Sequence, residues 1–400
     1  MSRSSENAQG RNLYVFGATS LFNDTASEMA YWVLPVFLIS IGAGPATLGV
    51  IEGVAESVAS LAKLFSGYLT DRVRRRKPVV VFGYVVANAL KPLLAIATAW
   101  WHVLIIRFGD RVSKGLRGAP RDVMLAESVE RSRLGSAYGL LQAMDSAGAI
   151  LGPLAALYLI SRYGFRGVFW AAAVPGLASI LIVALGARET GRFKAASKGS
   201  PPERSEGPVV VARPKLPASF YYVLFAVGLF SLGNSSDMFL VLRAQSAGIP
   251  ASHAPLLGLV FNITYTALSW PAGKLSDRFS KYALVAAGYV VFAIVYAVFA
   301  LAPSRAALWA MMSCYGLFYA LTTPVLKAVV AGSAPAEARG RAFGIFYFAT
   351  SVAALLSSVL TGELWKHYSA KLPFLLSAIL AAFAAVMLLA APKPAISQTS

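Results

Sequence analysis

Long apolar stretches separated by short polar connectors run along most of this 400-residue chain. A helix that crosses a bilayer needs about 20 mostly apolar residues. On that basis, the first half has predicted spans at 12–41, 48–69, 79–99, 102–125, 134–160 and 165–187. The second half has predicted spans at 218–244, 254–276, 282–302, 306–331, 341–365 and 372–391. The pattern therefore predicts an all-α membrane protein with 12 transmembrane helices.

A polar segment rich in Pro, Gly and charge separates the two groups of six spans and is typical of a flexible linker. The predicted organisation is an N-terminal tail (1–11), a six-helix bundle (12–187), a linker (188–217), a second six-helix bundle (218–391) and a C-terminal tail (392–400).

Composition agrees with residence in a membrane. Hydrophobic residues make up 57% of the chain, charged residues 14%, and the mean hydropathy is +0.62. The net charge of +18 does not indicate nucleic-acid binding, because the cations lie mainly in short connectors. The single cysteine, Cys314, excludes an intramolecular disulfide, and we expect neither a metal cluster nor a cofactor.

The positions of the cations also predict orientation. Lys and Arg cluster in the second and fourth connectors, in the linker and in the loops near 278–281 and 339–341. Such loops stay on the cytoplasmic side, so both termini are expected there, in the cell inner membrane. Residues 1–10 are polar and the first apolar stretch is long, so we expect no cleavable signal peptide.

Three short sequences occur twice, about half a chain apart. The segment GYLTDRVRRRK that begins at Gly67 is repeated as GKLSDRFSK from Gly273. Ser27-Glu28-Met29 is matched by Ser236-Asp237-Met238, and RLGSAYG from Arg133 by RGRAFG from Arg339. These matches predict a parallel pseudo-repeat of two bundles, an arrangement found in transporters that rock about a midplane site.

The repeated loop resembles the signature G-x-L-x-D-R-x-G-R-R/K of the major facilitator superfamily (MFS), with Arg74 and Ser280 in place of its second glycine. The fifth span resembles the start of that superfamily's antiporter motif, G-x8-G-x3-G-P-x2-G-G. The matching residues are Gly139, Gly148, Gly152 and Pro153. The resemblance covers essentially the whole chain and is strongest to 12-span bacterial proton-coupled exporters. It implies secondary active transport by a monomer, without ATP.

Ionisable side chains inside spans are costly and usually face a cavity or a partner. The candidate proton and substrate residues are Asp24, Glu28, Glu52, Glu56, Arg107, Arg111, Lys114, Asp145, Asn234, Asp237 and Lys327. We expect acids of the first span to face bases of the fourth, where substrate could displace a base and leave an acid to bind a proton. The alternative is that these residues form internal salt bridges with no role in transport.

The repeated loop is a candidate cytoplasmic gate. An acid at a helix end can cap a facing helix, and arginines can bind acids across the interface between the halves. The candidate gate residues are Gly67, Asp71, Arg72, Arg75, Asp122, Gly273, Asp277 and Arg278. Asp122 and Glu127 are expected to pair with cations of the Asp71 loop.

The fourth span also resembles the superfamily segment R-x-x-Q-G-x-G-A-A, but Lys114 and Arg117 make it more basic. Such a cavity favours an anionic or zwitterionic solute, or a chelate. Aromatic residues are interpreted as core and interface anchors rather than a ligand cage.

Four functions remain open, and proton-coupled efflux of a small solute by antiport is favoured. The main alternative is proton-coupled uptake of an organic anion or metal chelate. An intramembrane enzyme is disfavoured, because the sequence has no H-E-x-x-H, G-x-S-x-G or P-loop. A sensor that does not transport is the fourth possibility. The expected partners are a small-molecule substrate, protons and the lipid bilayer.

Overall fold

The computed structural model describes residues 10–42, 45–190, 215–250, 254–301 and 304–391. Most of the predicted N-terminal tail, the predicted C-terminal tail and most of the predicted linker therefore lie outside the described residues. The same holds for the side chains of Glu52 and Glu56, although the backbone of their helix is described.

The helices of the first half follow the predicted spans closely. They are α2 (Arg11–Ser40), α3 (Pro45–Arg72), α4 (Lys77–Leu93), α5 (Trp100–Glu127), α6 (Leu134–Ala171) and α7 (Ala173–Leu181), which continues as a π-helical turn, Ile182–Gly186. The label α6 covers the fifth span and the start of the sixth. Gly164 separates them with φ 63° and ψ −175°, a backbone conformation that is essentially limited to glycine.

The second half repeats this order with one departure from prediction. Its helices are α9 (Ala218–Gly233), α10 (Met238–Ser246), α11 (Ala254–Arg278), α12 (Lys281–Leu301), α13 (Arg305–Ser333), α14 (Arg339–His367) and α15 (Leu372–Leu389). The seventh span was expected to be continuous over 218–244 and is instead broken between Gly233 and Met238. Asn234 and the two serines after it favour turns over helix, which accounts for the position of the break.

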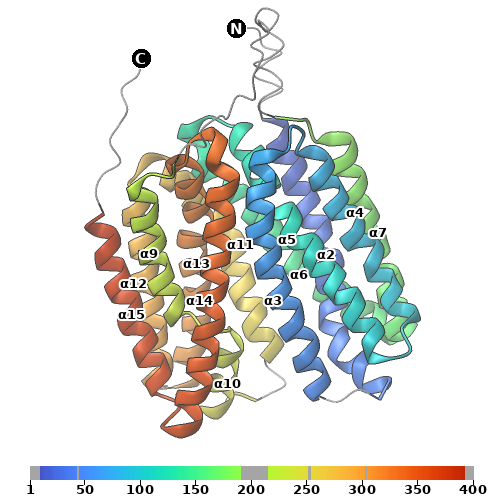
Figure 1. Ribbon diagram of the computed structural model, residues 1–400. Helices are drawn as coiled ribbons and strands as arrows, with labels where there is room; N and C mark the ends of the chain where they lie inside the picture. The colour runs from blue at the N-terminus through green and yellow to red at the C-terminus, as the bar shows by residue number, and fades with distance from the viewer. Residues whose placement is uncertain (1–9, 43–44, 191–214, 251–253, 302–303, 392–400) are drawn as a thin grey trace, which may run out of the picture.

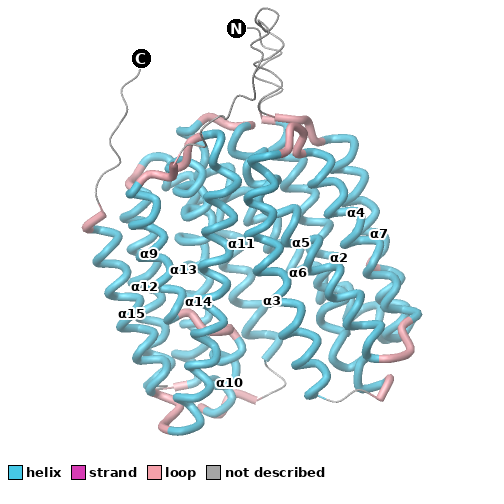
Figure 2. Tube along the Cα trace, viewed as in Figure 1, coloured by secondary structure: helices cyan, strands magenta, loops and turns pink. Residues whose placement is uncertain are grey.

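The described part of the chain is helical, with loops at the two ends of the bundle and no strand (Figures 1 and 2). Among the described residues, six segments are long and apolar enough to cross a membrane. They are Lys77–Ile96, Arg131–Gly186, Lys281–Leu301, Arg305–Ser333, Ala336–Trp365 and Leu372–Leu389, and the second of them contains two spans. Helices α2, α3, α5 and α11 are as long but more polar, as expected for helices that face a polar interior.

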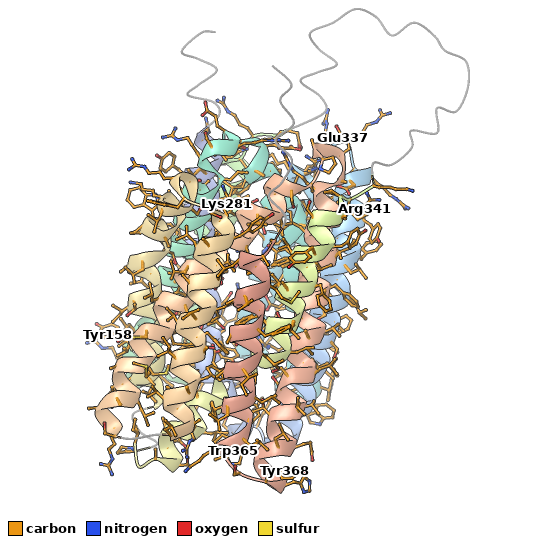
Figure 3. All side chains as sticks on the ribbon, turned by 90° about the vertical axis from the view of Figure 1, so that its left-hand side faces the viewer. Tyr158, Lys281, Glu337, Arg341, Trp365 and Tyr368 are labelled. Atoms are coloured by element: carbon orange, nitrogen blue, oxygen red, sulfur yellow. The ribbon has the colours of Figure 1, made fainter. Side chains whose placement is uncertain are left out.

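One end of the bundle is rich in arginine, and we call it the basic end. It holds Arg72, Arg76, Arg133, Arg278 and Arg339, and both α2 begins and α15 ends there (Figure 1). Figure 3 shows Lys281, Glu337 and Arg341 at this end, and Trp365 and Tyr368 at the opposite end.

The hydrophobic core joins the two halves at the basic end. One continuous cluster of buried side chains includes Tyr84, Val123 and Tyr138 of the first half together with Val325 and Phe343 of the second. A separate cluster, built around Phe37, Val103 and Phe169, belongs to the first half alone and lies toward the opposite end. Among the described residues, the cluster that joins the halves therefore lies at the basic end.

Within the first half, α6 packs closely on α2 through the predicted glycines. A Cβ on Gly148 would lie 2.5 Å from the carbonyl oxygen of Leu21, and one on Gly152 would lie 2.5 Å from the Cβ of Glu28. Pro153 follows inside the helix. Small residues allow this approach, because the helix backbones meet where a larger side chain would stand.

Gly152→Ala is expected to lower the thermal stability of the detergent-solubilised protein. The added methyl group has no room, and overpacking of this kind costs about 1–3 kcal/mol. The measurement is the midpoint of heat-induced loss of the monodisperse peak in size-exclusion chromatography.

The matched control is Gly118→Ala in α5, where a Cβ would have nothing within 4 Å. This variant should match or exceed the wild-type midpoint, because alanine favours a helix more than glycine does. Equal midpoints for the two variants would show that the contact between α6 and α2 tolerates the methyl group.

Candidate functional site

Two aspartates connect the halves at the basic end. Each accepts hydrogen bonds from the first amides of a helix in the other half. Asp71, at the end of α3, accepts hydrogen bonds from the amides of Gly340 and Arg341 at the start of α14, both at 2.8 Å. Asp277, at the end of α11, accepts from the amides of Gly135 and Ser136 at the start of α6, at 2.7 and 2.9 Å. Neither α6 nor α14 is capped by its own N-cap side chain. Each half thus supplies the anion that satisfies a helix N-terminus of the other.

The glycines of the repeated loop permit these contacts. A Cβ on Gly67 would lie 2.5 Å from the Cα of Gly344, and one on Gly273 would lie 2.3 Å from the carbonyl oxygen of Gly135. Both copies of the loop thus make the predicted capping contact, and the role of that contact as a gate stays a prediction.

For Arg72, Arg75 and Arg278, the expected binding of acids across the interface stays a prediction. Arg76 forms an ion pair with Glu127 at 2.7 Å, and both residues belong to the first half. Glu127 also accepts a hydrogen bond from Thr190, at 2.9 Å. The expected pairing of Glu127 with a cation of the Asp71 loop is thus right, but this pair does not cross the interface between the halves. Arg72, Arg75 and Arg278 are exposed at the same end.

The prediction that Asp122 pairs with a cation of the Asp71 loop is wrong. This fully buried carboxylate lies 3.0 Å from the guanidinium of Arg121 and accepts a hydrogen bond from the hydroxyl of Tyr347, on α14. Tyr138 donates to the backbone carbonyl of Asp122 at 2.7 Å. Asp122 lies more than a helical turn from the end of α5, too far into the bundle for the loop cations. It still links the halves, through a tyrosine that the sequence analysis did not single out.

A chain of polar contacts runs from this interface into the first half. Lys327 on α13 donates to the side-chain oxygen of Gln142 at 3.3 Å, and the amide of Gln142 donates to Asp145 at 3.2 Å. The carboxyl groups of Asp145 and Asp24 lie close to each other and interact. Two carboxylates at such close range repel each other, and a proton bound to one of them would relieve that repulsion.

The series of polar contacts continues from Asp24 to Lys91. Asn23 donates to Asp24 at 3.1 Å, Asn88 donates to Asn23 at 3.1 Å, and the buried ammonium of Lys91 donates to Asn88 at 2.7 Å. Lys91 also borders a cavity of about 20 Å³, room for about one water molecule, whose other polar lining groups are Ser27, Tyr31, Arg107 and Asp110. The carboxyl pair is therefore connected both to the second half and to a basic pocket in the first.

Acids of the first span were expected to contact bases of the fourth span. The structure shows these groups near each other but with other direct partners. Asp24 lies in the field of Lys114 and Arg117, but its direct partner is the acid Asp145. Arg117 is buried against the ring of Tyr84, 4.3 Å from its centroid, and donates to the carbonyl of Gly83. Lys114 is exposed to solvent although it lies near the middle of α5.

Other predicted residues lie apart from the carboxyl pair. Glu28 packs against Gly152, Arg107 lies 3.8 Å from Asp110, and Arg111 adds positive charge near Asp110.

In the second half, the carboxylate of Asp237 accepts hydrogen bonds from the hydroxyls of Tyr315 and Tyr319, at 2.7 and 3.4 Å. Asn234 lies in the break before it.

The sequence analysis missed Lys91, Gln142, Tyr315, Tyr319 and Tyr347. Lys91 carries the same signal as the residues that were found, a cation within an apolar span. Glutamine and tyrosine give no such signal, because both are common in helices without any role. Among the described residues, no group of three His, Cys, Asp or Glu side chains could hold a metal ion.

Asp71→Ala should loosen the basic end, since it leaves two helix amides without their charged acceptor. Hydrogen bonds to charged groups contribute about 1.5–3 kcal/mol, so the population with separated halves should rise about tenfold or more. The measurement is the distance distribution between spin labels at Arg74 and Glu337, two exposed positions in different halves, with Cys314 replaced by alanine.

The control is Glu130→Ala, which removes an exposed acid at the same end whose contact is with Ser132 of its own loop. Its distance distribution should match that of the parent. If Asp71→Ala also matches the parent, the capping contact does not hold the halves together.

Comparison with known proteins supports the fold and the repeat. The family model of the Major Facilitator Superfamily matches residues 16–242 and again 220–400. An uncharacterized MFS-type transporter of Methanocaldococcus jannaschii is 32% identical over 95% of this chain and 94% of its own length. Multidrug resistance protein MdtG of Escherichia coli is 26% identical over 67% of this chain and 66% of its own length.

A solved structure has the same architecture. The crystal structure of the human organic anion transporter MFSD10 covers 95% of this chain and 99% of its own, with a TM-score of 0.76 at 15% identity. At that identity the likeness shows the fold alone. Two bundles of six helices, a repeated capping loop at one end and a family match along the whole chain lead to one conclusion: this multi-pass membrane protein belongs to the major facilitator superfamily.

Proposed function

We propose that the protein is a proton-coupled efflux transporter of the cytoplasmic membrane that exchanges a small solute for protons. The bundles at 12–187 and 218–391 act as the two rocking units. The basic end faces the cytoplasm, in keeping with the side on which Lys and Arg accumulate in membrane proteins. Both termini then lie in the cytoplasm.

The observation that carries this proposal is the close approach of Asp24 and Asp145 within the membrane-spanning region. We take this pair as the proton carrier, and it lies one side chain, Gln142, away from Lys327 of the other half. When the halves part at the basic end, α13 moves away from α6 and takes Lys327 with it. The carboxyl pair then loses a neighbouring cation, so its affinity for protons depends on the position of the halves.

The exposure of Lys114 and Asp237 supports a water-accessible interior. Both residues are solvent-exposed, yet Lys114 lies near the middle of α5 and Asp237 contacts tyrosines near the middle of α13. The shared core and both capping contacts close the basic end. Solvent therefore enters from the opposite end, which corresponds to an outward-facing state in the proposed orientation.

Two observations favour efflux. The relative from Escherichia coli is named a multidrug resistance protein, and the glycines of α6 pack on α2 as closely as the antiporter-type motif suggests. The cations Arg111, Lys114 and Arg117 favour the second candidate, uptake of an organic anion or metal chelate by symport. Both functions use the same carboxyl pair, and they differ in whether solute and protons move in opposite directions or together.

Asp24→Asn and Asp145→Asn should each abolish coupling, because neither variant retains two carboxyl groups to share the proton. The measurement uses inside-out vesicles with an acidified interior and a pH-sensitive dye, to which anionic, zwitterionic and cationic solutes are added in turn. Wild-type vesicles should release protons when a transported solute is added, and the variants should respond like vesicles without the protein.

The control is Glu363→Gln, which neutralises an exposed acid paired only with the nearby His367 in the described structure. It should retain wild-type proton release. Undiminished release in Asp24→Asn would contradict the role of the carboxyl pair. Proton uptake together with solute accumulation in intact cells would replace efflux by the symport function.

A further inference from the structure

We propose that Asp237 and the aromatic rings around it bind the ammonium group of an amine-bearing substrate. This inference rests on the proposed transport function and adds a substrate class to it. The group of residues, called here the Asp237 site, consists of Asn234, Asp237, Phe261, Tyr265, Tyr315 and Tyr319.

The site lies where the seventh span is broken. Helix α9 ends at Gly233 and α10 begins at Met238, so the four residues between them are not helical. Asp237 precedes α10 directly, but its side chain does not cap that helix. The carboxylate is directed instead to the hydroxyls of Tyr315 and Tyr319 on α13. A broken helix near the membrane midplane is a recurrent place for substrate binding in transporters.

The charge of Asp237 is not matched by a cation of the protein. Among the described residues, its polar contacts are with the two tyrosines and not with a lysine or arginine. The cation closest to it in sequence, Arg243, donates to the backbone carbonyls of Phe299 and Ala300, at 2.9 and 3.0 Å, and so is committed to the end of α12. A carboxylate inside a membrane protein without a paired cation is costly, and a bound cation would relieve that cost.

The surroundings favour an organic cation. The ring centroids of Phe261 and Tyr265 lie 5.1 and 5.4 Å from that of Tyr319, and the ring of Tyr315 lies 5.2 Å from it. Tyr315 and Tyr319 contact the carboxylate, whereas Phe261 and Tyr265 pack on the ring of Tyr319. Aromatic faces attract ammonium groups, so rings next to a carboxylate favour an alkylated amine as the ligand. The buried side-chain oxygen of Asn234 has no hydrogen-bond partner in the described structure and could accept an N–H of the ligand.

The corresponding position of the first half is used differently. Glu28 matches Asp237 in the repeat, but it packs against the glycine face of α6. The interior of the first half is dominated by the cations of α4 and α5. The acid at this repeat position is therefore open to a ligand in the second half, and the Asp237 site is anionic and aromatic. Because Asp237 is solvent-exposed, a ligand can reach it.

The test is calorimetric titration of the purified full-length protein in detergent with benzyltrimethylammonium, a quaternary amine with one aromatic ring. We expect saturable binding, with a loss of about tenfold or more in affinity in Asp237→Asn and of about threefold or more in Tyr319→Leu, in line with the strength of cation–π contacts. Asp237→Glu keeps the charge and should retain part of the affinity. The anion phenylmethanesulfonate, with the same ring, should not bind at this site.

Two controls make the result decisive. Size-exclusion chromatography verifies that each variant is folded, and Glu130→Ala, which removes an exposed acid at the basic end, should bind the ammonium probe with wild-type affinity. Absence of binding to the wild type, or equal affinity in wild type and Asp237→Asn, would overturn the ammonium site and leave the proposed function standing. Binding that depends on Asp237 without any solute-driven proton movement would retain the site and overturn proton coupling.

Discussion

The architecture depends on two carboxylates that each complete a helix belonging to the other half. The first turn of α6 and the first turn of α14 have free amides and no cap of their own, and Asp277 and Asp71 supply it. An uncapped helix N-terminus in an apolar setting is unfavourable, so the halves are most stable when both contacts form together. The apolar core follows the same division, because among the described residues the cluster that joins the halves lies at this end.

The contacts that hold the halves together lie apart from the residues proposed to bind a proton. The caps lie at the basic end, whereas the carboxyl pair of Asp24 and Asp145 lies deeper, on helices that pack through glycine. Lys327 and Tyr347 connect the two regions, because each reaches from the second half to polar groups of the first. A rocking motion that breaks the caps must also disturb these contacts, so the fold couples the position of the halves to the charge around the pair.

Much of the fold was predictable from the sequence. The length of the apolar segments indicates the membrane spans, and the repeated loops indicate the symmetry of the two halves. The capping role of Asp71 and Asp277 was predictable for the same reason, since identical spacing in two places implies the same contact. The pairing of Asp24 with Asp145 was not, because it depends on how α2 and α6 rotate against each other. The break before Met238 and the tyrosines that surround Asp237 were likewise hidden, since aromatic residues in a membrane protein are ordinarily interpreted as core.

The two caps are the same contact made twice, with the halves exchanging roles. A contact of that kind is self-complementary, like the isologous interface of a twofold-symmetric dimer. A single six-helix unit that carries the loop aspartate and the uncapped glycine-rich helix start therefore has everything required to pair with a copy of itself. In architectural terms the chain is arranged like a homodimer joined into one chain, with buried cations in one half and an acid among tyrosines in the other.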